Sequence, residues 1–129
     1  MEYVESDYVQ TPSFVAKDMI KYFSPTGKIL DPCRGENRIF FDNLPTGTAW
    51  CEITEGNNFF DFKEKVDWII SNPPYSIFNP WMKHSYEIAD NIVYLLPTFK
   101  IFNALGLCRM YRKHGWIKHI DRKSTRLNS

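Results

Sequence analysis

The turn after the apolar run at 66–70 holds the residues best suited to chemistry: Asn72, Pro73, Pro74 and Tyr75. Proline fixes φ and donates no hydrogen bond, so the two prolines end a strand, stiffen the turn and hold Asn72 extended. A stiff turn can point the Asn72 side-chain oxygen and the Pro73 carbonyl the same way, as two acceptors for one exocyclic amine. Tyr75 adds a flat ring for stacking.

A second candidate site lies upstream, at residues 28–37. Their sequence predicts a short strand and then a glycine turn that opens a helix, with Asp31, Pro32 and Gly35 at the strand end. In an α/β sheet this turn receives the ligand, because glycine lets the backbone approach closely. Asn37 tolerates positive φ and can complete the turn. The segment is not a G-x-G-x-x-G dinucleotide fingerprint.

Together the two segments resemble the signature of amino-methyltransferases that use S-adenosylmethionine, above all the DNA adenine-N6 methyltransferases. The resemblance implies a Rossmann-like class I methyltransferase fold, an α/β architecture whose mostly parallel sheet has helices on both faces. It also implies that residues 72–75 are catalytic and that Asp31, Pro32 and Gly35 bind the cofactor. Asn37 departs from the family, which usually has a second glycine there, and its side chain could crowd the cofactor.

Further cofactor contacts follow from the resemblance. Residues 48–53 predict a second strand, and Glu52 at its end would accept both ribose hydroxyls. Residues 56–62 stand where the family has a short third strand with an acid that recognises the cofactor's adenine. Asn58 has the better spacing and Asp61 has the charge, so the two stay alternatives, and the neighbouring phenylalanines can equally be core.

Thr11 and Pro12 open a predicted helix. Thr11 can cap it, Pro12 suits its first position, and apolar residues recur at helical spacing over 14–20. In the resembled family a Thr-Pro at this place touches the carboxylate end of the cofactor, so both residues are cofactor-binding candidates. A plain helix cap is the alternative.

The remaining elements are expected to frame these sites. The sequence predicts a helix from 76 or 79 to 88, a strand at 91–96, a helix at about 99–113 that ends at Gly115, and a strand at 116–120. Strands that alternate with helices predict a parallel sheet.

We expect residues 1–120 to form a partial catalytic domain that lacks the family's closing hairpin. Residues 121–129 resemble a translated sequencing adapter, and we expect them to be non-native.

Composition fits one soluble domain, since 43% of the 129 residues are hydrophobic and 16% are aromatic. Three cysteines without a C-x-x-C pair indicate a reducing cytoplasm, bacterial or phage-infected by the resemblance, and argue against disulfides. The three histidines form no metal motif, so no metal is expected. We find no signal peptide or membrane span.

Charge is unevenly distributed although the net charge is only +1. Residues 1–108 carry 14 acidic and nine basic side chains, whereas residues 109–129 carry one acidic and seven basic side chains. The basic cluster can contact phosphate, but a solvated helix end explains it more simply.

The predicted function is transfer of a methyl group from S-adenosylmethionine to the N6 amine of a flipped-out adenine in DNA. By the same resemblance, the tetrad also serves enzymes that methylate RNA adenine, cytosine N4 or a protein glutamine amide. A tyrosine in fourth place favours adenine or glutamine, and the N-terminal Thr-Pro favours DNA. An inactive module that binds cofactor or nucleic acid is the alternative from another class.

Overall fold

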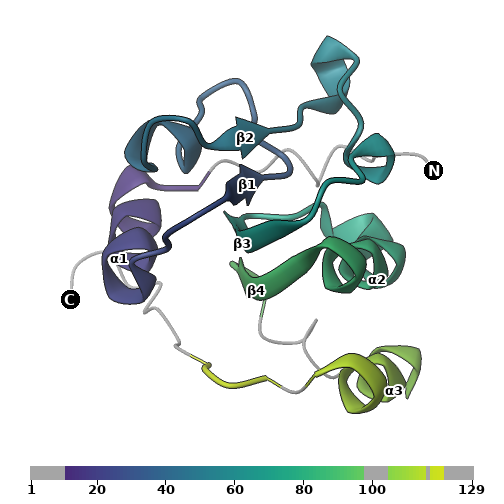
Figure 1. Cartoon of the computed structure of the whole chain (residues 1–129). Helices are drawn as coiled ribbons and strands as arrows, with labels where there is room; N and C mark the ends of the chain where they lie inside the picture. Colours follow the sequence, from purple (N-terminus) through teal and green to yellow (C-terminus); the bar gives the residue numbers. More distant parts are fainter. Residues whose placement is uncertain (1–10, 98–104, 116, 121–129) are drawn as a thin grey trace. The chain divides into compact units, whose positions relative to one another are not determined.

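The computed structural model describes residues 11–97, 105–115 and 117–120, and it divides into two units, residues 1–96 and 97–129 (Figure 1). The second unit holds helix α3 (Leu105–His114). The expected adapter-like tail, the start of the predicted helix at 99 and Trp116 lie outside the described residues. One catalytic domain over 1–120 therefore stays a prediction.

The first unit is built on a sheet of four parallel strands in the order β2-β1-β3-β4. The strands are β1 (Ile29–Asp31), β2 (Ala49–Trp50), β3 (Val66–Ser71) and β4 (Ala89–Tyr94). The predicted α/β fold with a parallel sheet is therefore confirmed. The strand expected at 91–96 begins and ends two residues earlier.

Helices cover both faces of this sheet, as predicted (Figure 1). Ile29 and Ile70 join the buried cluster that includes Ala16 of helix α1 (Ser13–Phe23). Their strand neighbours point to the opposite face, because side chains alternate along a strand. There Leu30 and Ile69 join the cluster that contains Trp81 of helix α2 (Phe78–Ile88).

The connections between strands also lie on different faces. The segment from β1 to β2 packs Phe40 and Leu44 into the α1 cluster. The segment from β2 to β3 packs Phe59 into the α2 cluster, with its ring 4.4 Å from that of Trp81. The chain thus reverses its winding between β1 and β3, and such a switch point leaves a crevice at the carboxyl ends of the strands.

The helix predicted after the glycine turn does not form. Residues 32–40 are irregular and lead only to the 3-10 helix η2 (Phe41–Asn43). Gly35 has φ 72° and Arg38 has φ 55°, and left-handed residues interrupt a right-handed helix. Positive φ falls on Arg38 rather than on Asn37, as the sequence had suggested.

The third strand implied for residues 56–62 is also absent. Glu52 and Asn57 form an isolated antiparallel bridge, after which the chain turns into the 3-10 helix η4 (Phe59–Asp61). The Asn58 side chain caps η4 by accepting a hydrogen bond from the Phe60 amide at 3.0 Å. Asparagine at this position therefore favours a turn over a strand.

Two predictions at the chain ends are wrong. Pro12, and not Thr11, is the N-cap of α1, and it has no side-chain cap bond. Residues 117–120 form no strand. None of the helices in the described residues combines the length and the apolar character needed to cross a bilayer.

Ile69 provides a test of the two-faced core. We expect Ile69→Ala to lower the free energy of unfolding by about 2–5 kcal/mol, because this fully buried side chain would leave a cavity. Phe14 is 58% exposed, so Phe14→Ala should change that free energy by less than about 0.5 kcal/mol. Denaturant unfolding of both variants measures the difference, and equal losses would contradict the assigned burial.

Candidate functional site

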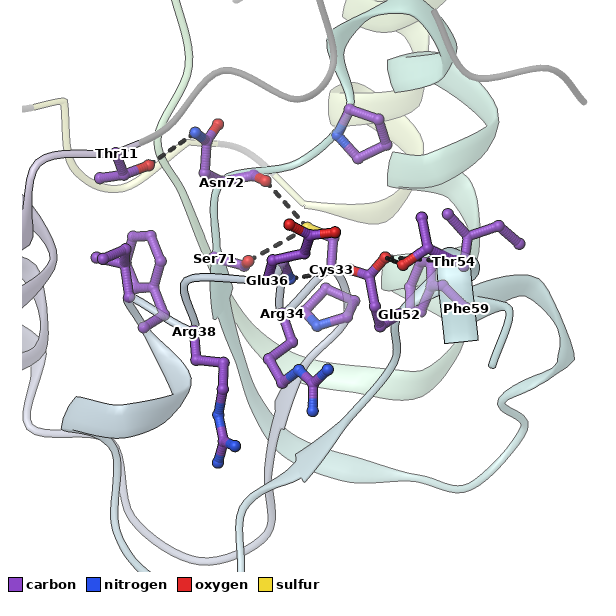
Figure 2. A pocket seen from close by; sticks show the side chains of 16 residues that line it. Thr11, Cys33, Arg34, Glu36, Arg38, Glu52, Thr54, Phe59, Ser71 and Asn72 are labelled. Carbon is purple, nitrogen blue, oxygen red and sulfur yellow. Dashed lines mark hydrogen bonds between the residues drawn. The ribbon is translucent and has the colours of Figure 1, made fainter. Parts of the chain in front are cut away.

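A cavity of about 310 Å³ lies at the switch point (Figure 2). Three loops line it, one after each of the strands β1, β2 and β3. They contribute residues 32–36 and 38–40, residues 52–54, and residues 71, 72 and 74, to which Thr11 and Phe59 are added. The cavity therefore lies where an α/β sheet binds ligands.

The structure brings half of the predicted site residues to this cavity. The predicted residues that line it are Thr11, Pro32, Gly35, Glu52, Asn72 and Pro74. The two principal motifs meet directly, since the Cys33 thiol donates a hydrogen bond to the Asn72 backbone carbonyl at 3.0 Å. The predicted proximity of the 72–75 turn and the Gly35 turn is thus present.

The other predicted site residues lie outside the lining: Pro12, Asp31, Asn58, Asp61, Pro73 and Tyr75. Pro73 is fully buried, and Pro12 and Asp61 are exposed. Neither candidate for reading the cofactor's adenine therefore borders the cavity. Phe59, from the same segment, is part of the core and also borders it.

Two hydroxyl groups flank the Asn72 side-chain amide. Its Nδ2 donates to Thr11 Oγ1 at 2.8 Å, and its Oδ1 accepts from the Tyr75 hydroxyl at 2.6 Å. The Tyr75 hydroxyl also lies 3.1 Å from the Leu95 carbonyl. Burial raises the pKa of Tyr75 to about 12, so its hydroxyl keeps its proton at neutral pH.

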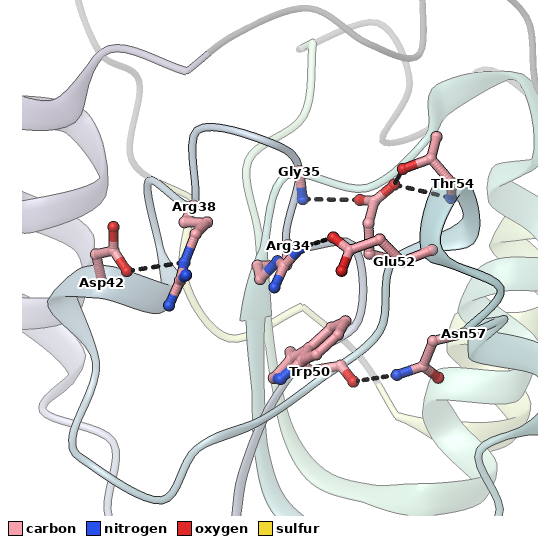
Figure 3. Close-up of polar contacts among 9 residues, drawn as sticks. Arg34, Gly35, Arg38, Asp42, Trp50, Glu52, Thr54 and Asn57 are labelled. Atoms are coloured by element: carbon pink, nitrogen blue, oxygen red, sulfur yellow. Dashed lines mark hydrogen bonds and ion pairs between the residues drawn. The ribbon is translucent and has the colours of Figure 1, made fainter.

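The Glu52 carboxylate joins the loop after β1 to the loop after β2 (Figure 3). Oε1 accepts from the Gly35 amide at 2.9 Å, and Oε2 accepts from the Thr54 amide at 3.0 Å and the Thr54 hydroxyl at 2.6 Å. Glu52 is only 6% exposed. Since an ionised carboxylate has about four acceptor positions, these three bonds leave room for about one more donor.

Asp31 is a buried carboxyl group with one unpaired oxygen. Its Oδ1 accepts from the Ser71 hydroxyl at 2.7 Å and from the Cys33 amide at 3.3 Å, whereas Oδ2 has no partner among the described residues. Burial raises the pKa of Asp31 to about 7, against the opposing effect of the Ser71 hydrogen bond. A proton or a cationic group would complete the environment of Oδ2.

Two arginines border the cavity. The Arg34 guanidinium lies 4.0 Å above the Trp50 ring and pairs with Glu55. Arg38 pairs with Asp42 at 3.1 Å (Figure 3). Because carboxylates neutralise both guanidinium groups, the rim carries little net positive charge from them.

Sequence reasoning missed several residues that line the cavity: Cys33, Arg34, Arg38, Thr54, Phe59 and Ser71. Ser71 immediately precedes Asn72, and Cys33 and Arg34 lie within the predicted turn, so proximity in sequence could have indicated them. Arg38 and Thr54 carried no comparable signal. The described residues contain no cluster of three or more His, Cys, Asp or Glu side chains that could hold a metal ion.

Comparison of the chain with protein-family models, with curated proteins and with solved structures gave no match. The chemistry of the cavity therefore carries the functional conclusion. That chemistry consists of an oriented amide, a preorganised carboxylate and a buried carboxyl group with an unpaired oxygen.

The raised pKa of Asp31 predicts a pH dependence of stability. The folded protein holds this proton up to about pH 7, whereas an unfolded aspartate releases it near 3.8. The stabilising contribution is therefore full below pH 3.8 and is lost as the pH rises to about 7. Asp31→Asn should remove this fall in the free energy of unfolding, and Asp61→Asn, at an exposed carboxylate, should retain it.

Denaturant unfolding at a series of pH values between 4 and 8 measures both effects. An identical slope in wild type and Asp31→Asn would show that Asp31 titrates elsewhere.

Glu52 provides a second test. In Glu52→Gln an amide NH2 must face either the Gly35 amide or the Thr54 amide, which are both donors. We expect the free energy of unfolding to fall by about 1–3 kcal/mol, the cost of a buried unpaired donor. Glu36→Gln, at an exposed residue that borders the same cavity, should change it by less than about 0.5 kcal/mol.

Thermal or denaturant unfolding of the two glutamine variants decides between these values. A cost for Glu36→Gln as large as that for Glu52→Gln would show that charge, and not the hydrogen bonds, explains the effect.

Proposed function

We propose that this protein transfers a methyl group from S-adenosylmethionine to a planar exocyclic amine, the N6 amine of adenine in DNA. One observation carries the proposal: the Asn72 turn and the Gly35 turn line a single cavity at the switch point of a parallel sheet. The strand order supports it, because β2-β1-β3-β4 is the central part of the doubly wound order with its third strand missing.

The residues present fit S-adenosylmethionine, which carries an ammonium group and two ribose hydroxyls. The unpaired Oδ2 of Asp31 suits a cation, and Asp31 reaches the cavity lining through its bond to Ser71. Glu52 keeps an acceptor position for a hydroxyl. A Cβ at Gly35 would meet no atom within 4 Å, so the backbone there borders open space that a ligand can approach.

When bound, S-adenosylmethionine supplies a methyl group to the amine nitrogen, while sulfur keeps the electron pair of the broken bond and an N–H proton passes to water. The chain's own residues position the amine. Asn72 Oδ1, which has a second lone pair beyond the Tyr75 bond, and the Pro73 carbonyl accept its two hydrogens. Positioning and electrostatics supply the catalysis.

DNA imposes a further requirement on the protein. An adenine amine inside a duplex is out of reach, so the base must leave the helix at a cost of a few kcal/mol. Tyr75 is the proposed stacking partner that offsets this cost. Its hydroxyl bonds to Asn72 and Leu95 hold it outside the cavity lining, so stacking requires a change in the position of the ring.

The same Tyr75 contact favours one other candidate, a module that binds the cofactor without transferring its methyl group. The Tyr75 hydroxyl occupies one acceptor position of Asn72 Oδ1, where an active site would receive the substrate amine. Calorimetry with S-adenosylmethionine tests the binding that both candidates share. Transfer of tritiated methyl to unmethylated DNA, to RNA and to a glutamine-containing protein then separates active from inactive protein and identifies the substrate.

Asn72→Ala is the sharpest test of the proposed role. We expect it to abolish methyl transfer, because the amine loses an acceptor, while the affinity for S-adenosylmethionine changes by less than about threefold, below the value of one hydrogen bond. Asn79→Ala is the matched control, since Asn79 is exposed on α2 and does not line the cavity. Tritium transfer and calorimetry measure the two effects, and a loss of cofactor binding would place Asn72 in a different role.

A further inference from the structure

The position of Thr11 calls for an explanation other than helix capping. Thr11 is 7% exposed and lines the cavity, while Pro12 caps α1. Its hydroxyl bonds to Asn72, 61 positions away in sequence (Figure 2). The contact therefore joins the N-terminal segment to the proposed catalytic amide.

The two flanking hydroxyls by themselves accept either orientation of this amide. In the structure Tyr75 donates to Oδ1 and Thr11 accepts from Nδ2. A half-turn of the amide would exchange its oxygen and nitrogen. Thr11 could then donate to Oδ1, and Tyr75 could accept from Nδ2 while donating to the Leu95 carbonyl 3.1 Å away.

The two orientations differ in what they offer a substrate. With Oδ1 beside Tyr75, the acceptor lies next to the ring proposed to stack on the base, whereas the turned amide places a donor there. A donor facing the substrate amine would repel its hydrogens. Only the observed orientation therefore supports the proposed transfer.

We propose that Thr11 is a positioning residue that sets the orientation of the Asn72 amide in response to an acceptor bound in the cavity. A hydroxyl has one hydrogen and two lone pairs. When a bound carboxylate takes the Thr11 hydrogen, Oγ1 can only accept, and its partner on Asn72 must be Nδ2. Oδ1 is then fixed toward Tyr75.

The inference rests on the proposed function for the identity of the acceptor, the carboxylate of S-adenosylmethionine. It goes beyond that function because it couples the two halves of the site. Occupation of the cofactor side would prepare the amide for the substrate amine, so cofactor and substrate would bind with positive coupling.

Nuclear magnetic resonance of the Asn72 side-chain amide tests the inference without reference to activity. Its 15N signal is identified by its loss in Asn72→Ala. In ligand-free protein, Thr11→Val keeps the side-chain shape and removes the hydroxyl, so we expect the signal to shift. Thr11→Ser keeps the hydroxyl and should leave the signal near its wild-type position.

The second measurement adds S-adenosylmethionine to the same samples, with calorimetry as the record of binding. We expect the Asn72 signal to move in wild type and Thr11→Ser and to stay in place in Thr11→Val. In turnover assays Thr11→Val should lower kcat by about two- to tenfold, the value of one hydrogen bond, and Thr11→Ser should restore it.

Two results would overturn the positioning role. One is an unshifted Asn72 signal in ligand-free Thr11→Val. The other is a response to bound S-adenosylmethionine that is the same in Thr11→Val and wild type. Absence of heat with wild-type protein is a separate outcome, because it would overturn the proposed function, and the ligand-free comparison would still decide the role of Thr11.

Discussion

The site depends on the parallel pairing of β1 with β3, two strands that are separated in sequence by β2. Connections leave these strands on opposite faces of the sheet, so nothing in the main chain fills the space between their carboxyl ends. The Ser71 hydroxyl spans the pair by donating to Asp31 at 2.7 Å, over 40 positions of sequence. Every loop of the cavity takes its place from this pairing.

Sequence patterns predicted the elements whose burial is continuous. The apolar run of β3 and the helical spacing of α2 were read correctly, because burial on both faces leaves a plain hydrophobic signal. The helix after Gly35 and the strand near Asn58 were not. Left-handed residues at Gly35 and Arg38 and a side-chain cap at Asn58 decide those segments locally, and their effects are weaker than any periodic pattern.

The candidate site divides in the same way. Asn72 and Gly35 were identified because proline and glycine constrain the backbone wherever they occur. The contacts of Cys33 with Ser71 and of Thr11 with Asn72 were not, since they span 38 and 61 positions and follow from strand register and helix placement. A cap for Thr11 was the local solution, and the tertiary hydrogen bond prevailed over it because Pro12 already occupies the cap position.

The two carboxyl groups of the site are prepared in opposite ways. Glu52 receives three donors from its own chain, so its orientation is fixed before any ligand arrives. Asp31 keeps an unpaired oxygen in a buried position, and its raised pKa records the cost of ionising it there. A residue needed only for packing would be apolar, since an unsatisfied buried oxygen weakens the fold. The unfavourable state of Asp31 therefore marks the place where a bound cation gains the most, because its charge would stabilise the ionised carboxylate that the fold alone disfavours.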